Sequence, residues 1–207
     1  MPRRRLVALA VVALLSIAIA GIPVGARAAT ADGQFARKGI WFKTCAEYVK
    51  ARGDQSKLYY MFVGWVDGYI TAINQYANDT FDVTFFETSE LLAALLDSNC
   101  RRNPEAQFFV AVDALTRAII NNRLQEPSPV VEASAGGQTV KLYAEALRRA
   151  QEALAKRGYF SGSADGAFTP ETRSAFEAFQ KAENMTITGL PDQLTLLRLF
   201  RQKPKAP

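Results

Sequence analysis

The sequence predicts an all-α protein with a four-helix N-terminal domain stapled by a disulfide and a three-helix C-terminal domain. Apolar residues recur at spacings of three and four in both halves of the 207-residue chain, as on the buried faces of helices. Residues 126–138 lack this periodicity and contain two prolines, two glycines and two serines, which indicates a linker. The predicted domains therefore cover residues 29–125 and 139–207.

Residues 1–28 have the layout of a secretory signal peptide. Three arginines at 3–5 precede an apolar stretch at 6–22, and the small-residue sequence A-R-A follows at 26–28. We therefore expect cleavage of this segment, a periplasmic location, and no membrane span in the mature chain. The alternative is that residues 6–22 stay in the membrane as an anchor, because their length is at the lower limit for spanning a bilayer.

The positive charge of the chain lies mostly in this predicted signal peptide. The whole chain has a formal net charge of +5, from 25 basic and 20 acidic residues. Four of the basic residues fall within 1–28, so the mature chain is almost neutral. A nucleic-acid partner is therefore not expected.

The two cysteines, Cys45 and Cys100, predict one disulfide. An exported protein with an even number of cysteines usually pairs them. The alternative is a reactive thiol, but the chain has no histidine to activate one.

The absence of histidine excludes most hydrolase mechanisms. Serine–histidine triads, cysteine–histidine dyads and histidine-based zinc sites all require imidazole. No catalytic residues, no metal and no cofactor are therefore expected. Glycoside hydrolysis by paired carboxylates is the remaining enzymatic alternative, and Asp82, Glu87 and Glu90 lie close together in the sequence. Acidic residues are also common at helix starts, which gives these three a structural explanation.

The first two helices of the N-terminal domain are predicted around Cys45 and Tyr48 and over residues 57–77. In the second, apolar residues form a stripe about five turns long. Gly64 and Gly68 lie one turn apart in this helix and indicate close packing against another helix.

The third and fourth helices are predicted from their start signals. Residues 84–87 have capping-box spacing before an apolar run that ends near Cys100. Residues 103–105, Asn-Pro-Glu, combine a cap residue, a first-turn proline and an acid, and predict the start of the fourth helix. A bond between the two cysteines would then join the first helix to the end of the third.

The C-terminal domain is expected to contain three helices. An apolar stripe at 143–154 ends at a glycine, and a loop rich in glycine, serine and aspartate follows at 159–168. Residues 169–171, Thr-Pro-Glu, predict the start of the second helix. A turn at 188–191 precedes a last helix at 194–200.

Residues 147–199 resemble the peptidoglycan-binding domain type 1 family. The similarity covers L-R-R-A-Q-E-A-L followed by R-G-Y, then G-S-A-D-G-A-F, then A-F-E-A-F-Q, with the order and spacing of the family. Two positions depart from its pattern: Ala150 replaces a leucine, and Thr169 replaces a glycine. The Thr169 hydroxyl can cap the following helix instead.

The resemblance implies peptidoglycan as a partner and directs attention to five candidate contacts. Tyr159 could stack on the ligand, and Asp165 with the backbone N–H groups near Gly166 could pair with amides. Arg157 or Arg173 could bind a carboxylate of the stem peptide. Each also has a structural alternative: Asp165 can hold its own loop, and Gly166 can serve a positive φ.

Residues 40–120 are similar to the small helical superfamily that contains the acid-stress chaperone HdeA and the immunity proteins of type VI secretion amidase effectors. The similarity rests on T-C-A-E-Y at 44–48, G-W-V-D-G-Y at 64–69 and C-R-R-N-P at 100–104. It implies a domain that interacts with a periplasmic protein.

Together, these features predict a non-catalytic, exported peptidoglycan-binding protein that places a helical protein-interaction domain at the cell wall. Two alternatives remain open. One is an inhibitor or immunity protein that acts against a peptidoglycan amidase. The other is a periplasmic acid-stress chaperone, whose switch would depend on carboxylates because no histidine is present.

Overall fold

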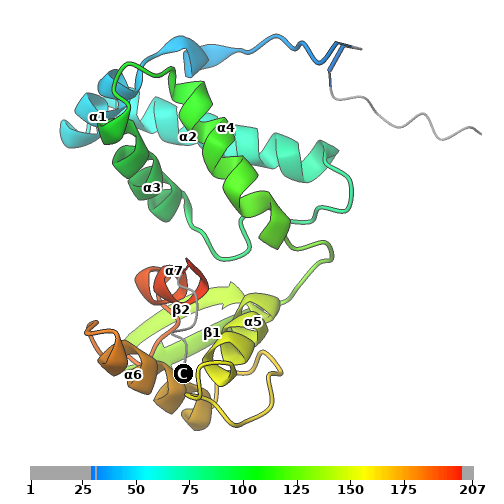
Figure 1. The fold of residues 1–207 in the computed structure, drawn as a ribbon, viewed down its shortest axis with the longest axis vertical. Coiled ribbons are helices and arrows are strands. Elements are labelled where there is room, and N and C mark those ends of the chain that lie inside the picture. Colours follow the sequence, from blue (N-terminus) through cyan, green and yellow to red (C-terminus); the bar gives the residue numbers. More distant parts are fainter. Residues whose placement is uncertain (1–28, 31, 202–207) are drawn as a thin grey trace, which may run out of the picture. The chain divides into compact units, whose positions relative to one another are not determined.

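The structure, a computed structural model, describes residues 29–30 and 32–201 (Figure 1). The predicted signal peptide at 1–28 lies outside the described residues. The described residues from 36 to 201 belong to one compact unit, which contains every helix and strand described. The elements are η1 (Gly39–Phe42), α1 (Cys45–Gly53), α2 (Lys57–Tyr76), α3 (Ser89–Arg102), α4 (Phe108–Ile119), η2 (Ile120–Asn122), β1 (Val130–Ala135), β2 (Gln138–Tyr143), α5 (Ala144–Ala155), α6 (Pro170–Ala182) and α7 (Gln193–Arg201). No helix in the described ranges combines the length and apolar character needed to cross a membrane.

Helices α1 to α4 surround an aromatic core. The rings of Tyr48, Phe62 and Phe108 pack with centroids 4.6 to 5.2 Å apart, and each residue is at most 1% exposed. The Tyr48 hydroxyl donates a hydrogen bond of 2.7 Å to the carbonyl oxygen of Ala93, which ties α1 to α3. The predicted helix over 57–77 is confirmed by α2.

The predicted disulfide is also confirmed. Cys45, the first residue of α1, is bonded to Cys100 near the end of α3, and both residues are fully buried. The bond therefore joins the first helix to the end of the third, as the sequence predicted.

The predicted starts of α3 and α4 were wrong. Helix α3 begins after Thr88, whose hydroxyl accepts a hydrogen bond from the Leu91 N–H. The Asn-Pro-Glu sequence at 103–105 forms a turn instead of a helix start. The carbonyl oxygen of Pro104 in this turn accepts a hydrogen bond from the Ala46 N–H, and that of Ala106 just after it accepts one from the Cys45 N–H. Both donors lie in the first turn of α1. Because the turn caps another helix, α4 begins only at residue 108.

The close packing expected at Gly64 and Gly68 is not made within the described chain. A Cβ added to either glycine would have no neighbouring atom within 4 Å. Both glycines lie on the exposed side of α2, because the buried face of this helix is formed by Phe62, Val66 and Ile70. The spacing of the glycines therefore leaves an open stripe on α2.

The all-α expectation was wrong for the segment before α5. Strands β1 and β2 form an antiparallel hairpin in which Ala135 pairs with Gln138. Gly136 and Gly137 make its two-residue turn with φ of 56° and 75°, which suits the twist of a hairpin. Most of the region interpreted as a linker is therefore ordered strand, and Tyr143 ends β2 instead of starting a helix.

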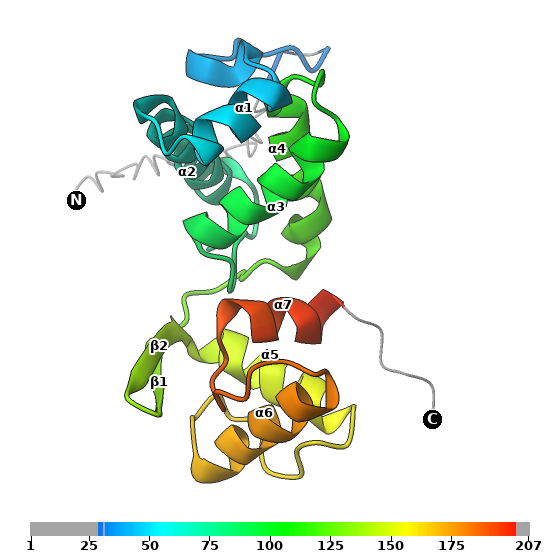
Figure 2. The same cartoon turned by 90° about the vertical axis from the view of Figure 1, so that its left-hand side faces the viewer.

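Buried side chains connect the group of helices α1 to α4 with the group α5 to α7. Phe85 and Phe86, which precede α3, pack against Phe200 of α7 with ring centroids 5.1 and 5.3 Å away. The Gln193 side chain donates to the Phe86 carbonyl oxygen at 2.7 Å and accepts from the Thr88 N–H at 3.0 Å. Figure 2 shows α7 on the side of α5 and α6 that faces α3. Residues 36–201 therefore contain an apolar core that continues from one group to the other.

Candidate functional site

A buried glutamine of α5 holds the loop that carries two of the predicted contacts. Gln151 is 1% exposed, and its Oε1 accepts a hydrogen bond of 2.8 Å from the Gly166 N–H. Its Nε2 donates to the Ala167 carbonyl oxygen at 3.0 Å and to the Thr172 hydroxyl at 3.1 Å. One side chain thus sets the shape of the loop between α5 and α6.

A second buried glutamine holds the loop between α6 and α7 in the same way. Gln180 is fully buried, and its Oε1 accepts from the N–H groups of Thr188 and Gly189 at 2.9 and 2.8 Å. Its Nε2 donates to the Leu190 carbonyl oxygen at 3.2 Å and to the Thr195 hydroxyl at 2.9 Å. Each buried polar group of this loop thereby has a partner.

These two anchors form an internal structural repeat. Each glutamine binds the N–H of a glycine with positive φ, Gly166 at 78° and Gly189 at 68°. Three residues after each glycine lies the cap of the next helix, Thr169 or Asp192. A fully buried threonine follows six residues after each glycine. The module is therefore two helix–loop–helix units that share α6.

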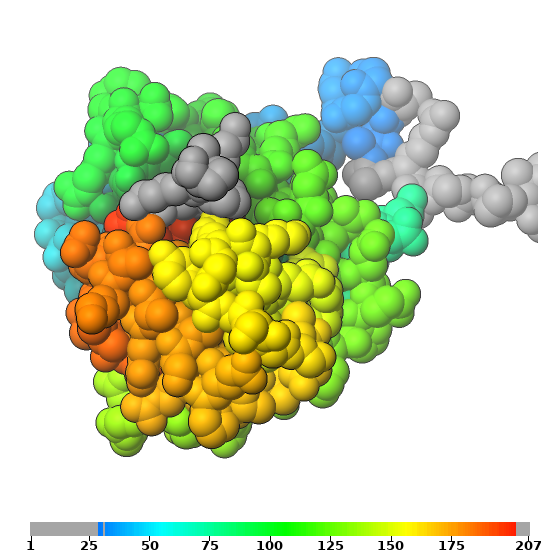
Figure 3. All heavy atoms as spheres, turned by 60° about the horizontal axis from the view of Figure 1, so that its bottom comes forward, coloured from blue at the N-terminus to red at the C-terminus, as the bar shows by residue number. Residues whose placement is uncertain are grey.

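The first loop lies tightly against the start of α5. A Cβ added to Gly166 would be 2.5 Å from the carbonyl oxygen of Ala144, well inside van der Waals contact. Figure 3 shows the loop (yellow) beside α6 (orange) on one face of the molecule. Only glycine fits at position 166, because both the positive φ and the close approach exclude a side chain.

The substitution Gly166→Ala should therefore lower the free energy of unfolding by about 3 kcal/mol, from left-handed strain and the collision with Ala144. Gly158→Ala is the matched control, because Gly158 has the same φ of 78° but no atom within 4 Å of an added Cβ. It should cost only about 1 kcal/mol. Urea unfolding of both variants measures the difference, and equal losses would show that the approach to Ala144 does not matter.

A groove of about 410 Å³ opens beside this loop. It is lined by the segment 124–129, the first turns of α5 and Asp165. The segment is held in place because the Ser128 hydroxyl accepts from the Glu145 N–H at 3.0 Å and the Pro129 carbonyl oxygen accepts from the Ala144 N–H at 2.8 Å. One wall of the groove thus comes from the segment before the hairpin and the other from α5.

Most charges in the groove neutralise each other. Arg148 donates to Glu145 and to Glu152 at 2.6 Å each, and Arg149 donates to Glu145 at 2.9 Å. The hydrogen bonds from Arg148 are the main reason why the pKa of Glu145 falls to about 2. This network stays ionised at neutral pH and fixes the first turns of α5.

Two carboxylates of the groove, those of Asp165 and Glu126, form no ion pair with a described residue. Asp165 Oδ1 accepts from the Ala167 N–H at 2.9 Å, which lowers the pKa of this exposed carboxyl. Pro127 and Pro129 add apolar surface beside them. The groove can therefore accept hydrogen bonds from hydroxyl, amide or amine groups while it contacts an apolar face of the ligand.

The structure does not bring the five predicted contact residues together. Asp165 lines the groove, and Gly166 is buried behind it. Arg157 lies beyond the other end of α5, where its guanidinium donates to the carbonyl oxygens of Ala153 and Leu199 at 3.0 and 2.7 Å.

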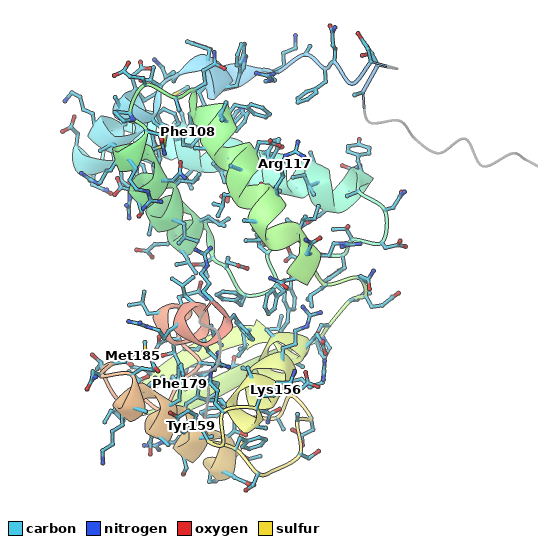
Figure 4. All side chains as sticks on the ribbon, viewed as in Figure 1. Phe108, Arg117, Lys156, Tyr159, Phe179 and Met185 are labelled. Atoms are coloured by element: carbon cyan, nitrogen blue, oxygen red, sulfur yellow. A yellow bond between two sulfur atoms is a disulfide. The ribbon has the colours of Figure 1, made fainter. Side chains whose placement is uncertain are left out.

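The remaining two predicted contacts also have partners within the module. The Tyr159 ring packs edge-on against Phe179 with centroids 5.8 Å apart (Figure 4). Arg173 donates to Glu177 at 2.8 Å. Of the five, Asp165 is the one that lines the groove.

Sequence reasoning missed the two glutamines and the segment 124–129. Gln151 lies between Leu147 and Leu154 on the buried stripe of α5, and a polar residue within such a stripe must find partners. This position could therefore have identified Gln151 from the sequence. For the segment 124–129 no local signal exists, because its place beside α5 results from packing.

Helices α5, α6 and α7 form a small helical module with two anchored loops and a groove beside the first of them. Comparison with known protein families matches residues 143–199 to a family of peptidoglycan binding domains. The match covers both glutamine anchors and supports the resemblance predicted for this region. The comparisons with curated proteins and with solved structures found no match. The resemblance of residues 40–120 to HdeA and the amidase immunity proteins has no support from these comparisons and stays a prediction.

Proposed function

We propose that this protein is an exported, non-catalytic peptidoglycan-binding protein that holds a helical interaction domain at the bacterial cell wall. The observation that carries the proposal is the family match at 143–199, which includes both anchored loops. The disulfide between Cys45 and Cys100 supports a location outside the cytoplasm, where such bonds persist. A periplasmic location and cleavage of residues 1–28 complete the proposal.

The groove beside Asp165 suits the chemistry of a glycan–peptide strand. Sugar hydroxyls and stem-peptide amides donate hydrogen bonds, and the carboxylates of Asp165 and Glu126 accept them. Proline rings supply apolar surface against which the face of a sugar can pack. We therefore assign a direct contact with peptidoglycan to Asp165. Gly166 and Gln151 shape the loop that carries it.

The helical group α1 to α4 is proposed as the interaction domain. Its exposed apolar side chains include Tyr60, Met61 and Tyr76, all on α2. Because Phe85 and Phe86 pack on α7, this domain would be presented in a defined orientation relative to the binding module.

Co-sedimentation with purified peptidoglycan sacculi tests the proposal, using the chain without residues 1–28. We expect the protein to sediment with the sacculi and Asp165→Asn to weaken binding about tenfold, equal to about 1.4 kcal/mol. Asparagine keeps the acceptor for the Ala167 N–H, so the loop should hold its shape. Glu105→Gln, on an exposed turn outside the groove, is the control and should sediment normally. Wild-type protein that stays in the supernatant at every sacculus concentration would contradict the proposal.

A further inference from the structure

A second cavity, of about 440 Å³, lies among α3, α4 and α7 and shares no lining residue with the groove beside Asp165. Its floor is mainly apolar and is formed by buried or half-buried side chains. Those used here are Phe86, Leu95, Leu115, Ile119 and Phe200. A volume of this size is in the range of sites that hold small organic ligands.

One carboxyl group interrupts this apolar floor. Glu87 is only 8% exposed and lines the cavity. Its carboxyl accepts hydrogen bonds from two backbone groups, its own N–H and the Phe86 N–H, the latter long at 3.5 Å, and it forms no ion pair within the described ranges. Burial raises the pKa of Glu87, and Asp82 adds to this effect, whereas the two backbone hydrogen bonds and the nearby Arg201 oppose it. A buried carboxylate with so few donors is costly, and a donor from a ligand would relieve that cost.

The rim of the cavity has the opposite charge. Arg102 of α3 and Arg201 of α7 are both exposed and line the cavity. Neither forms an ion pair with a described residue, although Arg102 donates to the Ser98 hydroxyl at 3.2 Å. The cavity therefore presents a buried hydrogen-bond acceptor, apolar side chains together with the polar Ser98, Asn99 and Asn122, and two exposed cations. Arginine is well suited to a carboxylate.

We propose that this cavity binds a short apolar peptide with free ends, about the size of a dipeptide. The N-terminal ammonium would pair with Glu87, the apolar side chains would pack against Leu95, Leu115 and Ile119, and the C-terminal carboxylate would meet Arg102 and Arg201. A simple alkyl amine could pair with Glu87 but would offer no anion to the two arginines. A fatty acid would offer Glu87 no donor of its own. A zwitterion with an apolar body satisfies all three parts of the cavity.

Calorimetric titration with three matched probes tests this inference on the chain without residues 1–28. The probes are the dipeptide Leu-Leu, its N-acetyl derivative without the ammonium, and its C-terminal amide without the carboxylate. We expect Leu-Leu to bind at least tenfold more tightly than either derivative. Equal affinity for Leu-Leu and N-acetyl-Leu-Leu, or no binding of Leu-Leu at millimolar concentration, would overturn the proposal.

Two variants then assign the ends of the ligand. Glu87→Gln should weaken Leu-Leu about tenfold and leave N-acetyl-Leu-Leu unchanged, whereas Arg201→Gln should weaken Leu-Leu and leave the amide unchanged. Loss of all three probes in the same proportion would instead indicate a collapsed cavity and contradict these assignments. Thermal unfolding of Glu87→Gln checks the fold, and its Tm should not fall because the glutamine oxygen can still accept from the backbone N–H groups of Glu87 and Phe86 while the cost of burying a charge is removed. Sedimentation of Glu87→Gln with sacculi should match wild type, since the groove beside Asp165 is separate.

Discussion

Replacing both cysteines, Cys45→Ala and Cys100→Ala, is expected to lower the free energy of unfolding by about 4 kcal/mol. The bond closes a loop with a sequence separation of 55 residues, and its loss restores the conformational freedom of that loop in the unfolded chain. Both side chains are fully buried between α1 and α3, so alanine leaves no unsatisfied polar group there. Urea unfolding followed by circular dichroism measures the change.

Reduction of the wild-type protein provides the control for this prediction. A reductant should shift the wild-type urea midpoint close to that of the double variant and should leave the variant itself unchanged. A double variant that unfolds at the same urea concentration as the oxidised wild type would show that the bond contributes little to stability.

Replacing Gln180 by methionine is expected to cost a similar amount, about 4 kcal/mol. Methionine has nearly the same length and volume, so the packing of α6 is retained while the hydrogen bonds are lost. The N–H groups of Thr188 and Gly189 and the carbonyl oxygen of Leu190 would then lack their partner. Each buried group left without a partner costs about 1 to 3 kcal/mol.

The exposed Gln75 of α2 offers a matched control, because Gln75→Met removes the same side chain where it has no buried partner. This variant should unfold within about 0.5 kcal/mol of wild type. If Gln180→Met were equally mild, the loop between α6 and α7 would be held by its packing and not by the glutamine. The same urea experiment distinguishes the two results.

The start of α6 shows when a local signal is sufficient. Thr169 caps this helix through the Thr172 N–H at 3.2 Å, with Pro170 in its first turn, as the sequence predicted. The similar Asn-Pro-Glu sequence at 103–105 does not start a helix. The carbonyl oxygens around it are taken by the N-terminus of α1, which is more than fifty residues away in the chain. A cap signal therefore succeeds only where no distant segment competes for the same backbone.

Only part of the candidate site could likewise be predicted from the sequence. Asp165 and Gly166 could be selected from the sequence because they belong to the G-S-A-D-G-A-F stretch that resembles the peptidoglycan-binding family. Their groove could not be predicted, since its other wall, at 124–129, has no local pattern that directs it to α5. The hairpin did carry a local signal, the Gly136-Gly137 pair, and was missed because the whole segment was interpreted as a linker.

The sequence alone determined the positions of the principal helices, the pairing of the two cysteines and the kind of module at the C-terminal end. Those features depend on apolar spacing, on caps and on a short loop pattern, all of which act over a few residues. Only the tertiary structure decided that Phe86 and Phe200 meet, that Glu87 is buried beside them, and that Asp165 lines a groove. Such outcomes depend on which apolar surfaces exclude water together, and that choice is made between segments far apart in the chain.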